Sequence, residues 1–177
     1  MIKEIYFAGG CFWCTEAVFQ RLKGVEKVTS GYANGKGEKP SYEDVTTGET
    51  GFAEAIKVEF NPDIISLEKL LEVFWATHDA TSLNQQGADK GTQYRSGIYF
   101  TESSQKEIIE KSKSEQPDND KIVTDIEPLK NFYTAEDYHQ NYYNENKENN
   151  GYCPVVITPK IVKLLEKFNN EVKEEYK

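Results

Sequence analysis

A short strand, a pair of glycines and a helix that begins with a cysteine form the stretch that most constrains this chain. Residues 5–7 are aliphatic and aromatic, as in β-strands. Gly9 and Gly10 then allow backbone angles that other residues avoid, and apolar residues recur at helical spacing from Phe12 onward. Cys11 therefore lies at the first turn of the helix, where free backbone N–H groups and the helix dipole favour a thiolate. The arrangement predicts a nucleophilic thiol, and a small buried core residue is the alternative.

The composition limits the kind of protein that the chain can be. It has 177 residues and a net charge of −9, which fits one domain and disfavours nucleic acid and anionic membranes as partners. No apolar run approaches the roughly 20 residues that span a bilayer, and residues 1–4 carry no apolar signal segment. Three cysteines, an odd number, do not suggest a disulfide scaffold. We therefore expect a single domain over residues 1–177, in the cytoplasm, with working thiols and no membrane or nucleic-acid partner.

Periodicity and turn signals divide the chain into alternating strands and helices. Strands are predicted near residues 5–7, 25–32, 53–60, 94–100, 121–127 and 155–157, and helices are predicted to begin near residues 12, 41, 66, 103, 134 and 159. The segment at about 144–153 is polar and is expected to be mobile, and a terminal helix follows at 159–176. Because short connections alternate with long ones, we expect an α+β two-layer domain whose mixed or antiparallel sheet is flanked by helices.

Cys11 and Cys14 form a C-x-x-C pair, the pattern of thiol–disulfide oxidoreductases. A zinc site is not expected, because a second pair of this kind is missing and the two histidines are far apart in the sequence. Phe12 and Trp13 lie between the cysteines and form either an apolar cup beside the nucleophile or part of the core.

Four other residues are candidates for assisting a thiol at position 11, and a fifth residue is notable for its position. Cys153 follows the polar segment, so it either reaches an oxidised cysteine or simply begins a strand. Tyr32, Asp44 and Tyr94 carry suitable polar groups, although a core tyrosine and a helix cap are the ordinary explanations. Glu54 falls on the apolar face of the predicted strand at 53–60, which is an unusual place for a carboxylate.

The motif Gly10-Cys11-Phe12-Trp13 resembles the active-site motif of the type A peptide methionine sulfoxide reductases, the MsrA family. Further blocks that look like this family follow in family order, at residues 31–32, 40–45, 50–55, 74–79, 89–96, 132–140 and 151–153. The resemblance implies the family's α+β fold, a mixed sheet with a ferredoxin-like plait core. It also implies reduction of the S epimer of methionine sulfoxide, free or in proteins, and thereby the repair of oxidised proteins.

The same resemblance implies the redox cycle. Cys11 resembles the nucleophile that becomes a sulfenic acid, and Cys153 resembles the cysteine that resolves this acid to a disulfide. Phe12 and Trp13 look like the apolar cup for the methyl group of the substrate. The family's use of thioredoxin, or another external dithiol, implies that no cofactor or metal is bound, and we expect a monomer.

Further residues correspond to the family's polar groups. Tyr32 and Tyr94 resemble the two hydroxyls that hold the sulfoxide oxygen. Asp44 stands where the family usually has a glutamic acid that protonates this oxygen, and a carboxyl kept neutral by aromatic surroundings suits that role. Asp89, His139 and Glu54 are expected in supporting positions.

The sequence leaves open which cysteine is the second thiol of the redox cycle. Cys14 stands where many members of the family have glycine, so it is a further candidate for resolving the oxidised Cys11. The alternative hypothesis for the whole chain is a thiol–disulfide oxidoreductase that uses Cys11 and Cys14 and does not need Cys153.

Overall fold

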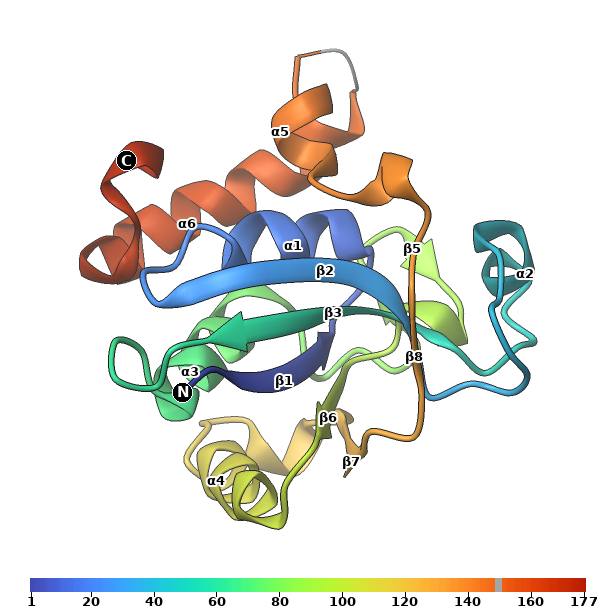
Figure 1. The fold of residues 1–177 in the computed structure, drawn as a ribbon, viewed down its shortest axis with the longest axis horizontal. Helices are drawn as coiled ribbons and strands as arrows, with labels where there is room; N and C mark the ends of the chain where they lie inside the picture. Colours follow the sequence, from blue (N-terminus) through green and yellow to red (C-terminus); the bar gives the residue numbers. More distant parts are fainter. Residues whose placement is uncertain (149–150) are drawn as a thin grey trace.

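One six-stranded sheet organises the molecule. The structure, a computed structural model, describes residues 1–148 and 151–177, and describes Cys153 by its backbone only. Figure 1 shows the sheet, whose strands in spatial order are β7 (Asp125–Pro128), β6 (Gly97–Phe100), β1 (Lys3–Ala8), β3 (Ala53–Phe60), β2 (Val25–Ala33) and β8 (Phe132–Thr134). Neighbouring strands are antiparallel, except that β6 and β7 are parallel. The predicted α+β fold with a mixed sheet is confirmed.

The helices are short and interleave with the strands. They are α1 (Phe12–Phe19), α2 (Tyr42–Thr46), α3 (Leu67–Thr77), α4 (Ser103–Ser114), α5 (Tyr142–Asn146) and α6 (Thr158–Phe168). A small hairpin, β4 (Gln85–Gln86) with β5 (Asp89–Lys90), leads into the 3₁₀ turn η1 (Thr92–Tyr94). The remaining short turns are η2 (Asn119–Lys121), η3 (Asp137–His139), the π-helical η4 (Cys153–Ile157), η5 (Asn169–Glu171) and η6 (Glu174–Tyr176).

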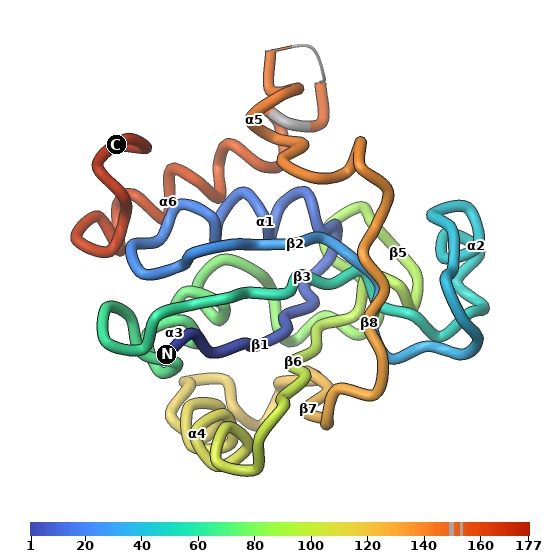
Figure 2. Tube along the Cα trace, viewed as in Figure 1, coloured from blue at the N-terminus to red at the C-terminus, as the bar shows by residue number. Residues whose placement is uncertain are grey.

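The two faces of the sheet bury different sets of side chains, because successive residues of a strand point to opposite sides. Ile5 and Phe7 of β1 belong to the main core, to which α1, α3 and α6 contribute. Tyr6 and Ala8 belong to a smaller cluster on the opposite face. In Figures 1 and 2, α1 lies against β2 and β3, and α6 lies beside α1. The cysteine motif at the start of α1 is therefore held by the centre of the sheet.

Strand β3 brings a carboxylate into this core. Glu54 shares the inner face with Ile56 and Val58, as the alternation predicts, and only 1% of its surface is exposed. A carboxylate in such a position raises its pKa or finds a partner, because burial of an unpaired charge is costly.

The C-terminal part differs from the sequence prediction. Residues 155–157 continue a π-helical turn into α6 instead of forming a strand. The terminal helix ends at Phe168, not near residue 176, because the chain turns back and Val172 pairs with Leu22 in an isolated bridge. Val172 is fully buried there, so burial of an apolar side chain outweighs continuation of the helix. Of the segment expected to be mobile, α5 includes the first part, and residues 149–150 lie outside the described residues.

Two local predictions near the site also differ. Tyr94 ends η1 and does not begin β6, which starts at Gly97. The helix predicted to begin near residue 134 does not form, because Thr134 belongs to β8 and only the 3₁₀ turn η3 follows, from Asp137, without a side-chain cap.

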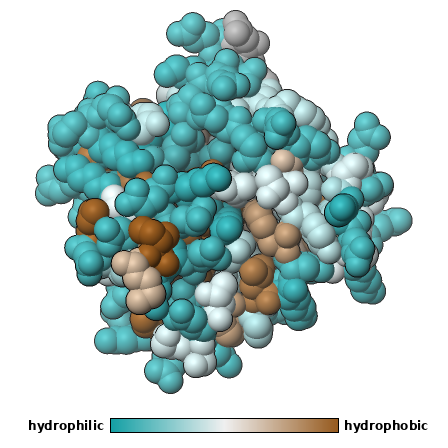
Figure 3. Space-filling view, in the orientation of Figure 1, coloured by the Kyte–Doolittle hydropathy of each residue, from teal (hydrophilic) through white to brown (hydrophobic). Residues whose placement is uncertain are grey.

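The face of the molecule in Figure 3 is mostly hydrophilic, with a few separate hydrophobic patches. No helix in the described ranges 1–148 and 151–177 is long and apolar enough to cross a bilayer.

Candidate active site

The turn between β1 and α1 presents Cys11 at the N-cap of the helix. Gly10 adopts a φ of 87°, in the left-handed region that favours glycine, and a Cβ there would lie 2.7 Å from the Cβ of Gln86. Cys11 has extended backbone angles, and its carbonyl accepts a hydrogen bond from the Cys14 N–H at 3.0 Å. The Cys11 side chain is partly exposed. The glycine turn thus aims a thiol at the surface from the end of a buried helix.

Glu54 reaches the same turn from β3. Its Oε1 accepts a hydrogen bond from the Phe12 backbone N–H at 3.1 Å. Burial raises the pKa of the Glu54 carboxyl to about 8, the Phe12 N–H opposes this shift, and the charges of Asp89 and Cys14 add to it. Its second oxygen, Oε2, is buried and has no hydrogen-bond partner within the described residues. Glu54 is therefore a neutral carboxylic acid near pH 7, with one oxygen available.

The two cysteines of the motif interact, and their pKa values shift in opposite directions. Burial, the interaction with Cys14 and the charge of Glu54 raise the pKa of the Cys11 thiol well above its ordinary value. The interaction with Cys11 lowers the pKa of Cys14 to about 7, and the charge of Lys160 also lowers it. The pKa of Cys11 is thus shifted opposite to the direction expected at a helix N-terminus, because burial beside Glu54 opposes the effect of the helix dipole.

The charges of Glu54 and Cys11 contribute to the pKa shifts of two tyrosines, Tyr42 and Tyr94. Burial raises the pKa of Tyr42 to about 12, and the charges of Glu54 and Cys11 add to the shift. The pKa of Tyr94 is also raised, first by burial and then by charges that include Glu54 and Cys11. Both phenols therefore stay protonated and can donate hydrogen bonds. Tyr94 is a predicted site residue, whereas sequence reasoning missed Tyr42.

Tyr32 does not serve the thiol. Its hydroxyl donates to Glu136 Oε1 at 2.8 Å, and the residue has no exposed surface. The second oxygen of Glu136 accepts from the Tyr42 backbone N–H at 2.8 Å. The role predicted for Tyr32 is corrected for this reason: its hydroxyl is bound to Glu136, and the carboxylate that holds it also fixes the start of the helix that carries Tyr42.

The structure also contradicts the role that the sequence predicts for Asp44. Its exposed carboxylate accepts a hydrogen bond from the Ser41 N–H at 3.0 Å, and Ser41 Oγ accepts from the Asp44 N–H at 3.1 Å. The bonds to Ser41 lower the pKa of the Asp44 carboxyl. An exposed and ionised helix cap cannot act as a neutral acid, so the predicted role of Asp44 is wrong, and Glu54 meets the physical requirement.

The aromatic residues of the motif have different surroundings. Trp13 stacks on Tyr142 with 3.6 Å between ring centroids and 4° between planes. Its Nε1–H donates to His139 Nδ1 at 3.0 Å, and burial lowers the pKa of His139, which keeps the imidazole neutral near pH 7. Phe12 is fully buried, so Trp13 is the aromatic residue of the motif that borders solvent. His139 thus orients Trp13, in the supporting position that was predicted for it.

A cavity of about 180 Å³ opens beside the two sulfur atoms. Its lining includes Cys11, Cys14, Asp89, Tyr152 and Lys160. The Tyr152 hydroxyl donates to Asp89 Oδ2 at 2.8 Å and lies 3.8 Å from Cys14 Sγ. The structure therefore brings Asp89 to the site, next to Cys14.

Two further predictions concern Cys153 and metal binding. The Cys153 side chain lies outside what the structure describes. Within the described ranges, no group of three or more His, Cys, Asp and Glu side chains is arranged to hold a metal ion.

A thiol, a neutral carboxylic acid and protonated phenols thus meet at the start of α1. Such a site can protonate an oxygen atom of a substrate while the Cys11 sulfur attacks the substrate atom that is bonded to this oxygen. The mixed sheet and this site define a thiol-dependent oxidoreductase.

Comparisons with known proteins agree with this class and narrow it. A family model described as peptide methionine sulfoxide reductase matches residues 3–173. The Pasteurella multocida protein named peptide methionine sulfoxide reductase MsrA is 54% identical over 170 residues, which cover 95% of this chain and 97% of that protein. The reduced form of Mxr1 from Saccharomyces cerevisiae is 43% identical with a TM-score of 0.80, covering 86% of this chain and 90% of that one. Mxr1 in its complex with Trx2 is similar at 34% identity and a TM-score of 0.57, covering 80% and 84%.

The chain belongs to the peptide methionine sulfoxide reductase family. Its activity is the thiol-dependent reduction of methionine sulfoxide, and the resemblance carried by the cysteine motif is confirmed.

Proposed function

We propose that the protein reduces the S epimer of methionine sulfoxide, with Cys11 as the nucleophile and Glu54 as the acid. The observation that carries this assignment is the buried Glu54 carboxyl, whose Oε1 is held by the Phe12 N–H at 3.1 Å and whose pKa is raised to about 8 by burial. A carboxylic acid that is neutral at pH 7 has a proton to give where an ionised one has none.

The first step moves oxygen from substrate sulfur to enzyme sulfur. Cys11 attacks the sulfoxide sulfur as a thiolate, and Cys14, which lies beside it and whose pKa is lowered to about 7, accepts the thiol proton. Glu54 donates a proton to the sulfoxide oxygen, which weakens the bond from sulfur to oxygen. The bond between the two sulfur atoms then breaks as the hydroxyl moves from the substrate sulfur to Cys11, so methionine leaves as a thioether and Cys11 becomes a sulfenic acid. Sulfur in the substrate is reduced and sulfur in the enzyme is oxidised.

Tyr42 and Tyr94 hold the oxygen during this step. Their hydroxyls are protonated and lie in the field of Cys11 and Glu54, so their hydrogen bonds strengthen as negative charge develops on the oxygen. Trp13, fixed by Tyr142 and His139, supplies the apolar wall for the methyl group of the substrate.

A second thiol then converts the Cys11 sulfenic acid to a disulfide. The Cys14 sulfur, whose pKa is near 7, attacks the sulfenic sulfur of Cys11, which forms a disulfide and releases water. Cys153, the resolving thiol that the resemblance implies, enters this bond by thiol exchange. The shared cavity lining of Cys11 and Cys14 supports the order of these steps.

An external dithiol restores the enzyme. The solved complex of Mxr1 with Trx2 supports a thioredoxin as the reductant. On this proposal the protein is a cytoplasmic monomer that repairs oxidised proteins, binds no cofactor and has neither nucleic acid nor a membrane as a partner.

The experiment is a coupled assay with NADPH, thioredoxin reductase and thioredoxin, run on the two separated sulfoxide epimers. The wild type is expected to consume NADPH with the S epimer only, and Cys11→Ser is expected to consume none with either. Equal rates on both epimers contradict the stereochemical assignment, and activity in Cys11→Ser contradicts the nucleophile.

A further inference from the structure

We propose that the open edge of β2 binds the backbone of an extended substrate peptide, next to the oxidised methionine. This subsite rests on the proposed sulfoxide reductase function and adds a substrate class to it, namely unfolded polypeptide segments.

The register of β2 decides which of its backbone groups point outward. The Ser30 N–H donates to Gln140 Oε1 at 2.9 Å, and the Ser30 carbonyl accepts from Gln140 Nε2 at 2.9 Å, so both groups point away from β3. Two residues later, Tyr32 pairs with Tyr133 of β8 on the same side. Because the outward direction repeats every second residue, Val28 also presents its N–H and carbonyl to this side.

Both ends of this edge are covered, and its middle is open. The pairing of β8 with β2 extends over residues 31–33, and one further backbone hydrogen bond runs from the Ala135 N–H to the Ser30 carbonyl. At the other end, the C-terminal residues 171–173 exchange backbone hydrogen bonds with residues 21–23. Between them, residues 25–29 have no neighbouring strand on this side within the described part of the chain. A short open edge of this kind is suited to one added strand.

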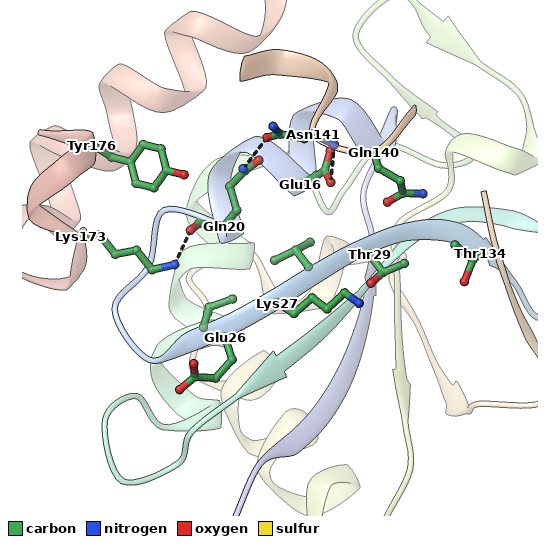
Figure 4. A pocket seen from close by; sticks show the side chains of 12 residues that line it. Glu16, Gln20, Glu26, Lys27, Thr29, Thr134, Gln140, Asn141, Lys173 and Tyr176 are labelled. Carbon is green, nitrogen blue, oxygen red and sulfur yellow. Dashed lines mark hydrogen bonds between the residues drawn. The ribbon is translucent and has the colours of Figure 1, made fainter. Parts of the chain in front are cut away.

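A groove of about 420 Å³ follows the open edge. Figure 4 shows Glu16 and Gln20 of α1 on one side of it and Lys27 and Thr29 on the strand below. The Gln140 amide at its end already bonds to the strand as a peptide group does. A bound peptide forms the next hydrogen bonds of this edge, with the N–H and carbonyl of Val28. Because the edge offers backbone donors and acceptors, its expected occupant is a polypeptide backbone.

The groove lies close to the reactive thiol. Glu16 is five residues after Cys11 on α1, which is about 7.5 Å along the helix axis, or about two to three residues of extended chain. The segment 139–142 borders both places, because its middle lines the groove and its ends contact Trp13. A peptide whose sulfoxide is at Cys11 can therefore lay neighbouring residues along β2.

The test compares Val28→Pro with Val28→Ala. Proline removes the outward N–H without removing a bond to β3, whereas alanine shortens the side chain and keeps the N–H. Two substrates are used, an unstructured nonapeptide with one central methionine S-sulfoxide and the short N-acetylmethionine S-sulfoxide amide. Relative to the short substrate, Val28→Pro is expected to lower kcat/KM for the nonapeptide about fivefold through KM, and Val28→Ala to leave this ratio unchanged. An unchanged ratio in Val28→Pro, or an equal loss in Val28→Ala, overturns the subsite.

A second measurement does not depend on the folding of a variant. Nonapeptides that are N-methylated at one position each lose one hydrogen-bond donor, and the wild type is tested with all of them. A bound strand is expected to raise KM at alternate positions on one side of the sulfoxide, and an equal KM at all positions overturns the subsite. Failure to reduce even the short substrate contradicts the proposed function instead.

Discussion

At the scale of single residues, the surroundings of a side chain decide its chemistry more than its type does. Asp44 and Glu54 are both carboxylic acids, yet the bonds to Ser41 lower the pKa of Asp44, and burial raises the pKa of Glu54 to about 8. Tyr32 and Tyr42 differ in a similar way, because the hydroxyl of Tyr32 is bound to Glu136. The active site is therefore defined by which groups are buried around one thiol.

Glu54→Gln is expected to lower kcat at least about 100-fold, because general acid catalysis contributes factors of this size and an amide has no acidic proton. The matched control is Asp44→Asn, which removes an exposed helix cap and is expected to leave kcat near the wild-type value. Both are measured in the coupled assay, with alkylation of Cys11 to verify that the thiol is intact. A large loss of kcat in Asp44→Asn would return the acid role to that residue.

Tyr42→Phe is expected to lower kcat about 10- to 100-fold, because it removes a hydrogen bond to an oxygen that becomes charged. Tyr32→Phe is expected to change kcat little and to lower the free energy of unfolding by about 1 kcal/mol, because the part-buried hydrogen bond from the hydroxyl to Glu136 is lost. Steady-state kinetics and urea unfolding separate the two effects. The opposite pattern would show that the Tyr32 hydroxyl leaves Glu136 for the substrate.

The pH dependence of the first step is expected to be bell-shaped. The rate of formation of Cys11 sulfenic acid rises as the thiol pair loses its first proton, near the lowered pKa of Cys14 at about 7. It falls as pH rises through about 8, because Glu54 loses the proton that it donates. The measurement is kcat/KM between pH 5.5 and 9.5. The residual activity of Glu54→Gln is expected to lack the falling limb, and a falling limb that survives would assign it to another group.

At the scale of elements, three parts of the chain meet at one helix end. The first turn of α1 carries both thiols, β3 brings Glu54, and the segment from β8 to α5 brings Glu136, His139 and Tyr142. The hydrogen bond from the Phe12 N–H to Glu54 uses one of the free donors at the helix N-terminus. The same donors that were expected to favour a thiolate therefore hold the acid.

Disulfide mapping after one turnover without reductant tests the order of the thiols. In Cys153→Ser, a disulfide between Cys11 and Cys14 is expected to accumulate, because Cys14 lies beside Cys11 in the same cavity lining. In Cys14→Ser, disulfide formation is expected to slow about tenfold or more, because proximity of the second thiol is lost. An oxidised Cys153→Ser enzyme that stays at the sulfenic acid stage would exclude Cys14 from resolution.

At the scale of the whole molecule, one core joins the sheet to the helices that carry the site. Residues from α1, α3 and α6 belong to the main core together with β1 and β3. The chain then returns after α6, and Val172 bridges to Leu22 just after α1. The C-terminal residues thereby brace the helix that presents Cys11.

Val172→Ala is expected to lower the free energy of unfolding by about 2 kcal/mol, because it removes two fully buried methyl groups and leaves a cavity. The matched control is Val162→Ala on α6, where 47% of the side chain is exposed and the loss is expected to be within about 0.5 kcal/mol. Urea unfolding measures both. Equal losses would show that the C-terminal bridge does not stabilise the fold.

Most of the elements could be predicted from the sequence, because local signals specify them. The strand predicted at 53–60 and the helix starts predicted near residues 41 and 66 all correspond to observed elements, where Ser41 and Ser66 cap α2 and α3. The strand predicted at 155–157 failed because three apolar residues carry no period, and packing on α1 placed them in a helical turn.

The sequence by itself determined the cysteine motif, the strand–turn–helix that presents it and the buried side of β3 on which Glu54 lies, because these depend on neighbours in the chain. Only the tertiary structure decided that Glu54 and Tyr42, and not Asp44 and Tyr32, accompany the thiol. The physical reason is that desolvation and hydrogen-bond partners come from residues distant in sequence, such as Glu136 and the Phe12 N–H, and spacing along the chain does not encode them.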